Sequence, residues 1–200
     1  MRKLILFSFC FLISVASFAQ NEKQARKVLD KASAIISNRS GAKANFAVYS
    51  NKVKTTGSIA IKGNKFQVTT PQAIVWYNGK TQWSYMKQNN EVNISNPNQS
   101  QRAQMNPYVF VNCYKKGYKM NMKDVGNSKE IHLTATSKNS IPQMYIIVDD
   151  RTGVPSHVKM KINGSWTTIV ISNFKKANLS DSYFNFNAKE FPHAELIDLR

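Results

Sequence analysis

Residues 65–95 read KFQVTTPQAIVWYNGKTQWSYMKQNNEVNIS, and this stretch decides the fold. Its apolar and aromatic residues form short runs separated by polar turn residues. Asn78-Gly79 lies between two such runs and predicts a β-hairpin with a type I′ turn, which needs positive φ at both central positions. In the run after the turn, Trp83 and Tyr85 share one face because strand side chains alternate. The stretch therefore predicts antiparallel strands that present aromatic side chains on one surface, with no catalytic group among them.

Similar runs continue along most of the chain. A helix with three- and four-residue apolar spacing is predicted at Glu22–Ile36, and a polar break followed by an apolar segment at 108–116 reads as a short helix or a strand. Eleven antiparallel strands and these helical segments predict an α+β protein, mainly β, with one strongly curved sheet and a movable helical lid. The predicted strands are Ala44–Ser50, Thr55–Lys62, Asn64–Thr70, Ile74–Tyr77, Gln82–Met86, Glu91–Ser95, Tyr118–Asp124, Lys129–Thr136, Gln143–Asp150, Pro155–Ile162 and Thr167–Phe174.

The N-terminus has the pattern of a secretory signal peptide. Arg2 and Lys3 precede an apolar run, and Ser17-Phe18-Ala19 is a small-x-small cleavage pattern. We expect residues 1–19 to be removed, which leaves one domain over 20–200 in the periplasm. An uncleaved N-terminal anchor helix is the alternative. Of the two cysteines only Cys113 would remain, so no internal disulfide is expected, and a small buried hydrophobe is the plain interpretation of Cys113.

The charge is strongly basic, with 28 Lys and Arg against 11 Asp and Glu and a net charge of +17. The basic residues are scattered singly, whereas nucleic-acid readers concentrate them on one element, so no nucleic-acid partner is predicted. Such a surface suits transient contact with anionic lipid headgroups or with an acidic partner. A generic solvated surface is the alternative for any single lysine.

Signals of enzymatic chemistry are poor. His132, His157 and His193 stand far apart without metal-ligand spacing, and we interpret the first two as strand residues with satisfied hydrogen bonds. Asp149-Asp150 precede a turn, where short acidic side chains cap backbone amides. We therefore predict no enzymatic activity, no cofactor and no metal site.

In order and spacing, several short motifs resemble those of the periplasmic outer-membrane lipoprotein carrier proteins, the LolA-like family. Asn78-Gly79-Lys80-Thr81-Gln82-Trp83-Ser84-Tyr85 is similar to the family segment D-G-K-T-x-W-x-Y, with Asn in place of Asp. The resemblance runs across the whole chain after the signal peptide. The other similar segments are Ala44-Asn45-Phe46, Gly57–Lys62, Phe66-Gln67-Val68, Asp150–Val158, Tyr183–Phe186 and Phe191-Pro192.

The resemblance implies an incompletely closed antiparallel barrel whose concave hydrophobic face is covered by helices. It also implies a carrier function. Such a monomer would accept acylated lipoproteins from an inner-membrane ABC transporter, shield their acyl chains in a hydrophobic cavity and deliver them to an outer-membrane acceptor. Shielding is needed because burial of one methylene is worth roughly 0.8 kcal/mol, or about 13 kcal/mol for a chain of about 16 carbons.

Candidate cavity residues come from the apolar positions of the predicted strands. Ordinary core packing is the alternative for each of them, and the face that each strand turns inward is an open choice. Val109, Phe110 and Cys113 are the candidate lid. The candidate lining is Phe46, Val48, Ile59, Ile61, Phe66, Val68, Trp83, Tyr85, Met144, Ile146 and Val148.

One position departs from the family pattern. Members carry an Arg-Pro pair after the strand that matches Gly57–Lys62, and that Arg helps to hold the lid, whereas this chain has Lys62-Gly63-Asn64. Because Lys lacks the planar fork of Arg, the gating of a lid is left open. Three other functions also stay open: a periplasmic protein for lipids other than lipoproteins, a basic scaffold for acidic polymers, and a hydrolase.

Overall fold

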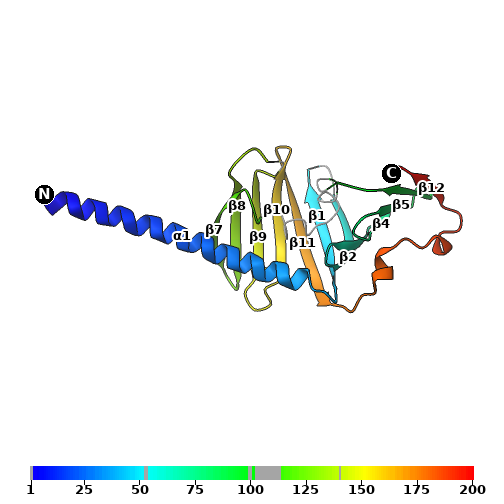
Figure 1. The fold of residues 1–200 in the computed structure, drawn as a ribbon, viewed down its shortest axis with the longest axis horizontal. Helices are drawn as coiled ribbons and strands as arrows, with labels where there is room; N and C mark the ends of the chain where they lie inside the picture. Colours follow the sequence, from blue (N-terminus) through cyan, green and yellow to red (C-terminus); the bar gives the residue numbers. More distant parts are fainter. Residues whose placement is uncertain (1, 52–53, 99–100, 102–113, 140) are drawn as a thin grey trace.

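The computed structural model describes residues 2–51, 54–98, 101, 114–139 and 141–200, with side chains from residue 19 onward. Over these ranges, the long helix α1 (Arg2–Ile36) accompanies a twelve-stranded sheet in the order β12-β6-β5-β4-β3-β2-β1-β11-β10-β9-β8-β7 (Figure 1). The strands are β1 (Ala42–Ser50), β2 (Lys54–Lys62), β3 (Lys65–Thr69), β4 (Ala73–Tyr77), β5 (Gln82–Met86), β6 (Glu91–Ser95), β7 (Tyr118–Val125), β8 (Ser128–Ala135), β9 (Gln143–Asp149), β10 (Pro155–Ile162), β11 (Ser165–Lys176) and β12 (Glu195–Asp198).

The predicted fold class is confirmed. The eleven predicted strands correspond to β1–β11, which pair antiparallel with their neighbours. The predicted helix forms the C-terminal part of α1. The prediction lacked β12, which pairs parallel with β6. The candidate lid residues Val109, Phe110 and Cys113 lie outside the described residues.

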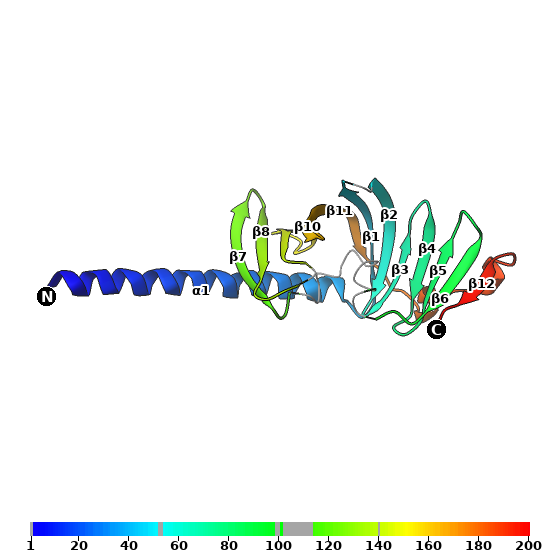
Figure 2. The ribbon, with the colours of Figure 1, turned by 90° about the horizontal axis from the view of Figure 1, so that it is seen from above.

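The sheet is an open arch. Figure 2 shows it curving over α1, and β7 and β12 are its two ends. Gly57 lies at a tight point of the bend, opposite Phe46 in the β1–β2 ladder. A Cβ atom at Gly57 would lie 2.3 Å from the Thr69 carbonyl oxygen and 2.6 Å from the Phe46 ring. Only glycine allows this close approach of strand and ring.

The main core lies on the concave face of the arch. α1 contributes a stripe at helical spacing, Ala25, Leu29, Ala32 and Ile36, and each of these side chains is at most 1% exposed. They join one cluster with side chains from β1–β4 and β7–β11. In the part of the chain whose side chains are described, no helix is long and apolar enough to cross a bilayer.

α1 also protects one end of the sheet. Asn21 donates from Nδ2 to the Met122 carbonyl oxygen (2.8 Å) and accepts from the Met122 N–H at Oδ1 (2.7 Å). One side-chain amide thus occupies the place of a neighbouring strand on β7, which is an end strand.

A C-terminal cover, defined as residues 177–198, packs on the outer face of the arch. Its short 3-10 helices are η1 (Asp181–Phe184) and η2 (Ala188–Glu190). Leu179 and Phe184 bury themselves against Ala60 of β2. The cover then passes β4 and β5 and ends as β12. The segments Tyr183–Phe186 and Phe191-Pro192, which resemble closing strands in sequence, lie in this cover outside the sheet.

One predicted turn type is wrong. The hairpin at Asn78-Gly79 exists, but of these two residues only Gly79 has a positive φ, of 104°. The loop is longer, because the Asn78 N–H donates to the Thr81 carbonyl and Asn78 Oδ1 accepts from the N–H groups of Lys80 and Thr81. Asn163-Gly164 instead has φ of 49° and 81°, as a type I′ turn needs.

Candidate functional site

The concave face is the candidate site, and strand register determines its composition. Ile59 pairs with Val68, and Ile61 pairs with Phe66, so these four side chains point to one side. Across the other half, Ile146 pairs with both Ile131 and Val158 on the same side. An apolar surface therefore runs continuously from β3 through β1 to β7.

Nine of the eleven candidate lining residues lie on this face. Eight are buried in the core cluster and Val48 packs against it from a half-buried position. Their identity as a ligand lining stays a prediction. The nine are Phe46, Val48, Ile59, Ile61, Phe66, Val68, Met144, Ile146 and Val148.

Trp83 and Tyr85 lie on the opposite face, so the prediction of one shared lining has to be divided. Trp83 pairs with Trp76, and Tyr85 pairs with Ile74. In β4, Ile74 and Trp76 alternate with Val75 and Tyr77, which face the concave side. The run Gln82–Met86 shows which residues share a face but leaves open which face turns inward.

On the outer face, Trp83 and Tyr85 adjoin an aromatic cluster under the C-terminal cover. The Trp76 ring lies 5.6 Å from both Phe186 and Phe191, and Tyr85 lies 4.6 Å from Phe191. Edge-to-face and tilted pairs at such distances are favourable packing. The signal available in the sequence was the set of aromatic residues in the otherwise polar tail, which sequence reasoning did not connect to β4.

The concave face changes chemistry at β5 and β6. Here the inward positions are Gln82, Ser84, Asn93 and Ser95, since Ser84 pairs with Val75 and Asn93, and Gln82 pairs with Tyr77 and Ser95. Gln82 is only 3% exposed. Its Nε2 donates to Ser84 Oγ at 3.1 Å, but its Oε1 is buried without a hydrogen-bond partner among the described residues. A polar strip thus ends the apolar face.

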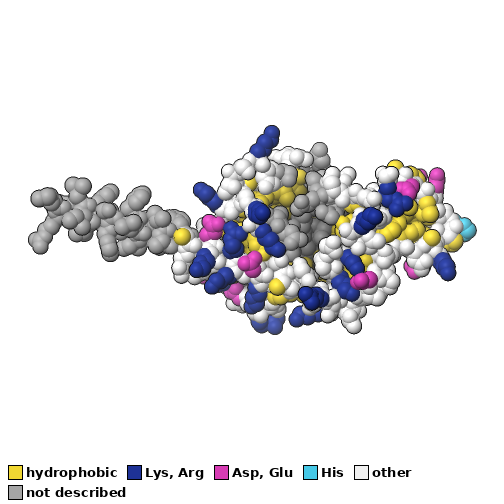
Figure 3. Space-filling view, in the orientation of Figure 1, with side chains coloured by type: hydrophobic (Ala, Val, Ile, Leu, Met, Phe, Trp, Pro, Cys, Tyr) yellow, Lys and Arg dark blue, Asp and Glu magenta, His cyan; other side chains and the backbone are white. Residues whose placement is uncertain are grey.

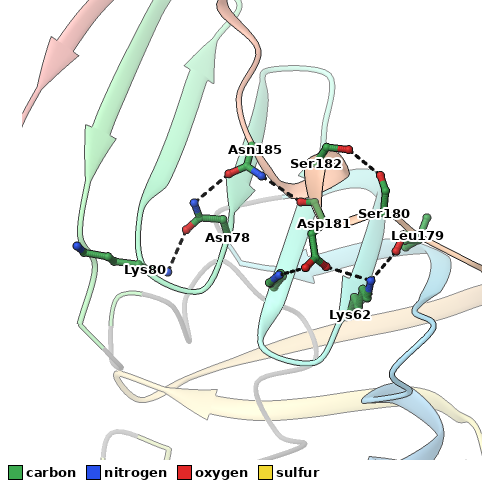
Figure 4. A network of polar contacts seen from close by, with 9 residues as sticks. Lys62, Asn78, Lys80, Leu179, Ser180, Asp181, Ser182 and Asn185 are labelled. Atoms are coloured by element: carbon green, nitrogen blue, oxygen red, sulfur yellow. Dashed lines mark hydrogen bonds and ion pairs between the residues drawn. The ribbon is translucent and has the colours of Figure 1, made fainter.

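Lys62 holds the C-terminal cover. Its Nζ donates to the Leu179 carbonyl oxygen at 2.8 Å and lies 3.0 Å from Asp181 Oδ1 (Figure 4). Lys65 lies 2.9 Å from Asp181 Oδ2. Hydrogen bonds from Lys65 and Lys62 hold the pKa of the Asp181 carboxyl below its usual value. Nearby, Asn185 bonds Asn78 and the Asp181 carbonyl (Figure 4).

A second polar contact connects α1 to the segment before β7. The Tyr114 hydroxyl donates to Asp30 Oδ1 at 2.6 Å, and the Tyr114 side chain is buried. Burial, followed by the hydrogen bond to Asp30, raises the pKa of Tyr114 to about 12. Figure 3 shows Lys and Arg side chains distributed over the described part of the face on which α1 lies, with hydrophobic side chains among them.

No catalytic arrangement is present among the described residues. His157 Nδ1 lies 3.1 Å from the adjacent Ser156 Oγ, and within the described ranges no carboxylate bonds a histidine. His132 stacks on Tyr145 at 4.2 Å, but its buried Nε2 has no hydrogen-bond partner within the described ranges, so the expectation of satisfied hydrogen bonds is wrong for this atom. The described part of the chain also has no group of three His, Cys, Asp or Glu placed to hold a metal.

Asp149 caps a turn as predicted. Its Oδ1 accepts from the N–H and the hydroxyl of Thr152, both at 2.7 Å. These bonds hold the pKa of Asp149 below its usual value. Asp150 points elsewhere, with Oδ2 3.6 Å from Lys129 Nζ. The two neighbouring carboxylates therefore have separate structural partners.

Comparison with known proteins gives a family and a fold. The family model described as "Outer membrane lipoprotein carrier protein LolA" matches residues 15–164. No curated protein matches the sequence. The structure of an uncharacterized conserved protein from Thermus thermophilus is similar with a TM-score of 0.61 and 13% identity, over 88% of this chain and 99% of that chain. A LolA superfamily protein from Nitrosomonas europaea gives a TM-score of 0.46 and 13% identity, over 81% of this chain and 97% of that one.

Proposed function

Since the chain belongs to the outer membrane lipoprotein carrier protein LolA family, we propose that it is a periplasmic, non-enzymatic carrier of acyl chains. Its concave face shields the acyl chains of lipoproteins and moves them from the inner to the outer membrane. Residues 1–19 act as the cleaved signal peptide, and residues 20–200 form the carrier domain. An inner-membrane ABC transporter and an outer-membrane acceptor are the proposed partners of the monomer.

The one-sided apolar face supports this proposal most strongly. Its side chains come from strands on both sides of the arch and from one helix, and they include several half-buried members such as Val48, Val75 and Met122. Covering half-buried apolar groups at the margin of a core with a hydrocarbon chain is favourable, because it removes their exposed apolar surface from water. Met side chains in the same cluster can adapt their shape to such a chain. Val109, Phe110 and Cys113 remain the proposed lid.

Two neighbouring residues of β4 provide a matched test of the proposed face. Val75 faces the concave side and Ile74 the outer side, and both are half-buried. We expect Val75→Asn to weaken binding of a fluorescent fatty-acid probe at least about tenfold, because it places an amide against the hydrocarbon chain. Ile74→Asn should leave probe binding within about twofold, since it lies on the far side of the sheet. Equal effects of the two variants would contradict the proposal.

The cargo can be identified by native mass spectrometry of the protein after it has been purified from its own cell envelope. Copurified acylated protein supports the lipoprotein carrier. Copurified free lipid would support the alternative of a periplasmic protein for other lipids. An empty protein that is retained on polyanions in a salt-sensitive manner would support the alternative of a basic scaffold. The net charge of +17 falls to +15 when Arg2 and Lys3 are removed with the signal peptide, and this charge favours such binding.

A further inference from the structure

The concave face ends in a polar strip, defined as Gln82, Ser84, Asn93 and Ser95. The strip directly continues the apolar face, because Tyr77 pairs with Phe66 on one side and with Gln82 on the other. Ser84, Asn93 and Ser95 are half-buried, and Gln82 is buried. A site for an acyl chain and a site for a polar group are therefore adjacent on one surface.

Gln82 is the unusual member of the strip. Its Nε2 has a partner, Ser84 Oγ, but its Oε1 has none in the described part of the chain, although the residue is only 3% exposed. Exchanging the two ends of the side-chain amide would only leave Nε2 unpaired instead, because Ser84 can serve just one end. A buried amide oxygen without a donor is costly, and native proteins rarely leave one. The missing donor points to a ligand.

We propose that Gln82 Oε1 accepts a hydrogen bond from the N–H of an amide-linked acyl chain, whose hydrocarbon part lies along the apolar face. A secondary amide fits the strip because it brings a donor for Gln82 and a carbonyl that the hydroxyl of Ser84 or Ser95 can reach as donor. An ester-linked chain has the same length and the same carbonyl but no N–H. The strip would therefore select amide-linked over ester-linked chains. This inference rests on the proposed carrier function.

Three probes of equal chain length isolate the N–H. They are N-methylhexadecanamide, N,N-dimethylhexadecanamide, which keeps the amide carbonyl without the N–H, and methyl hexadecanoate. Each is used to displace a fluorescent fatty-acid probe from the full-length mature protein. We expect the N–H amide to bind about five- to tenfold more tightly than the other two, as one buried hydrogen bond provides.

Gln82→Met removes the carboxamide and retains the length of the side chain. We expect it to lower the affinity for the N–H amide to that of the ester, to leave the ester unchanged, and to leave the Tm unchanged or raised because an unpaired buried oxygen is lost. Gln67→Met is the matched control, because Gln67 pairs with Trp76 on the outer face. It should retain the full preference for the N–H amide.

Equal binding of all three probes by the unaltered protein would overturn this inference and leave the carrier function intact. An equal loss of all three on Gln82→Met would also overturn it, since that pattern indicates a purely structural role for Gln82. Failure of every probe to bind would overturn the carrier function itself, and the inference with it.

Discussion

The two parts of the sheet bury their apolar side chains on opposite faces. In β1–β3 and β7–β11 most buried apolar side chains point to the concave side, where they form one cluster with the apolar stripe of α1, whereas Ala60 of β2 is buried outward. In β5, the aromatic residues Trp83 and Tyr85 point outward, and the inward positions are polar. β4 lies between the two parts and is apolar on both faces, with Val75 and Tyr77 inward and Ile74 and Trp76 outward. The continuous apolar run AIVWY thus marks the strand where two cores meet.

Aromatic content alone therefore does not identify a binding face. The two covers are held by different contacts. α1 is held by its buried apolar stripe, by the hydrogen bonds of Asn21 to Met122 of β7, and by the hydrogen bond between Tyr114 and Asp30. The C-terminal cover is held by an aromatic cluster and by ion pairs to Lys62 and Lys65. We therefore expect the two parts to respond separately to substitution.

The largest effect is expected from Phe66→Ala. Phe66 is 1% exposed on the concave face and its ring lies 5.2 Å from Tyr77. Its truncation leaves a cavity in the main core and should lower the free energy of unfolding by about 3–5 kcal/mol, measured by urea denaturation. The adjacent Gln67→Ala on the outer face should cost less than about 1 kcal/mol. Similar losses at both residues would refute the division of the sheet by face.

A smaller and local effect is expected from Phe191→Ala. The half-buried Phe191 contacts both Trp76 and Tyr85. Its loss should destabilise the C-terminal cover by about 1–3 kcal/mol, because apolar area on the outer face becomes exposed. Hydrogen exchange should speed up at residues 177–198 and stay unchanged in α1. Faster exchange throughout the sheet would instead show that the two faces form one cooperative unit.

Most of the fold could be predicted from the sequence because its signals are local. Alternating runs and turn dipeptides mark β1–β11, and the stripe from Ala25 to Ile36 marks the packed part of α1. The orientation of β5 could not be predicted, because QWSYM has one aromatic and one polar face and either could turn inward. That choice depends on Phe186 and Phe191, about a hundred residues later in the chain.

The remaining errors also concern contacts that are distant in sequence. β12 is short, partly charged and pairs with β6 across a gap of about a hundred residues, so ELID has no pattern of its own. The Asn78 loop is longer than a type I′ turn because the Asn78 side chain accepts from two backbone N–H groups. The role of Lys62 could not be predicted from the sequence, because its partners Leu179 and Asp181 come from the C-terminal cover, more than a hundred residues later.

Tyr114→Phe tests the contacts that hold α1, because it removes the hydrogen bond to Asp30. We expect a loss of about 1–2 kcal/mol at pH 7, since the acceptor is a carboxylate. The pKa of Tyr114 is raised to about 12 in the folded protein, so its contribution is complete below the ordinary value of about 10 and is lost as pH rises from 10 towards 12. The difference in unfolding free energy between the two proteins should shrink over that range.

Ultraviolet titration provides the independent check. One tyrosinate that ionises late should disappear in Tyr114→Phe, whereas Tyr49→Phe should leave that late-ionising group in place, because Tyr49 is a separate residue that is 44% exposed. Retention of the late-ionising group in Tyr114→Phe would assign the raised pKa to another tyrosine.

The smallest effect is expected from Asp181→Asn, which weakens the ion pairs of the C-terminal cover. Asp181 is exposed, so solvent screens its attraction to Lys62 and Lys65, and global stability should hardly change. Opening of residues 179–185 should nevertheless become more frequent at pH 7 and low salt, as measured by hydrogen exchange. The folded pKa of Asp181 lies below the usual value of about 4, so its contribution is present above pH 4 and is lost as pH falls through the folded pKa.

The difference between Asp181→Asn and the unaltered protein should therefore be largest near neutral pH and vanish in acid. Asp198→Asn is the control, because Asp198 bonds only Arg200 among its described partners and does not touch β2. Lys62 contacts both the Asp181 carboxylate and the Leu179 carbonyl, and the second contact survives in Asp181→Asn. Faster opening in Lys62→Met than in Asp181→Asn would therefore show that the carbonyl contact, together with the ion pair, fastens this cover to β2.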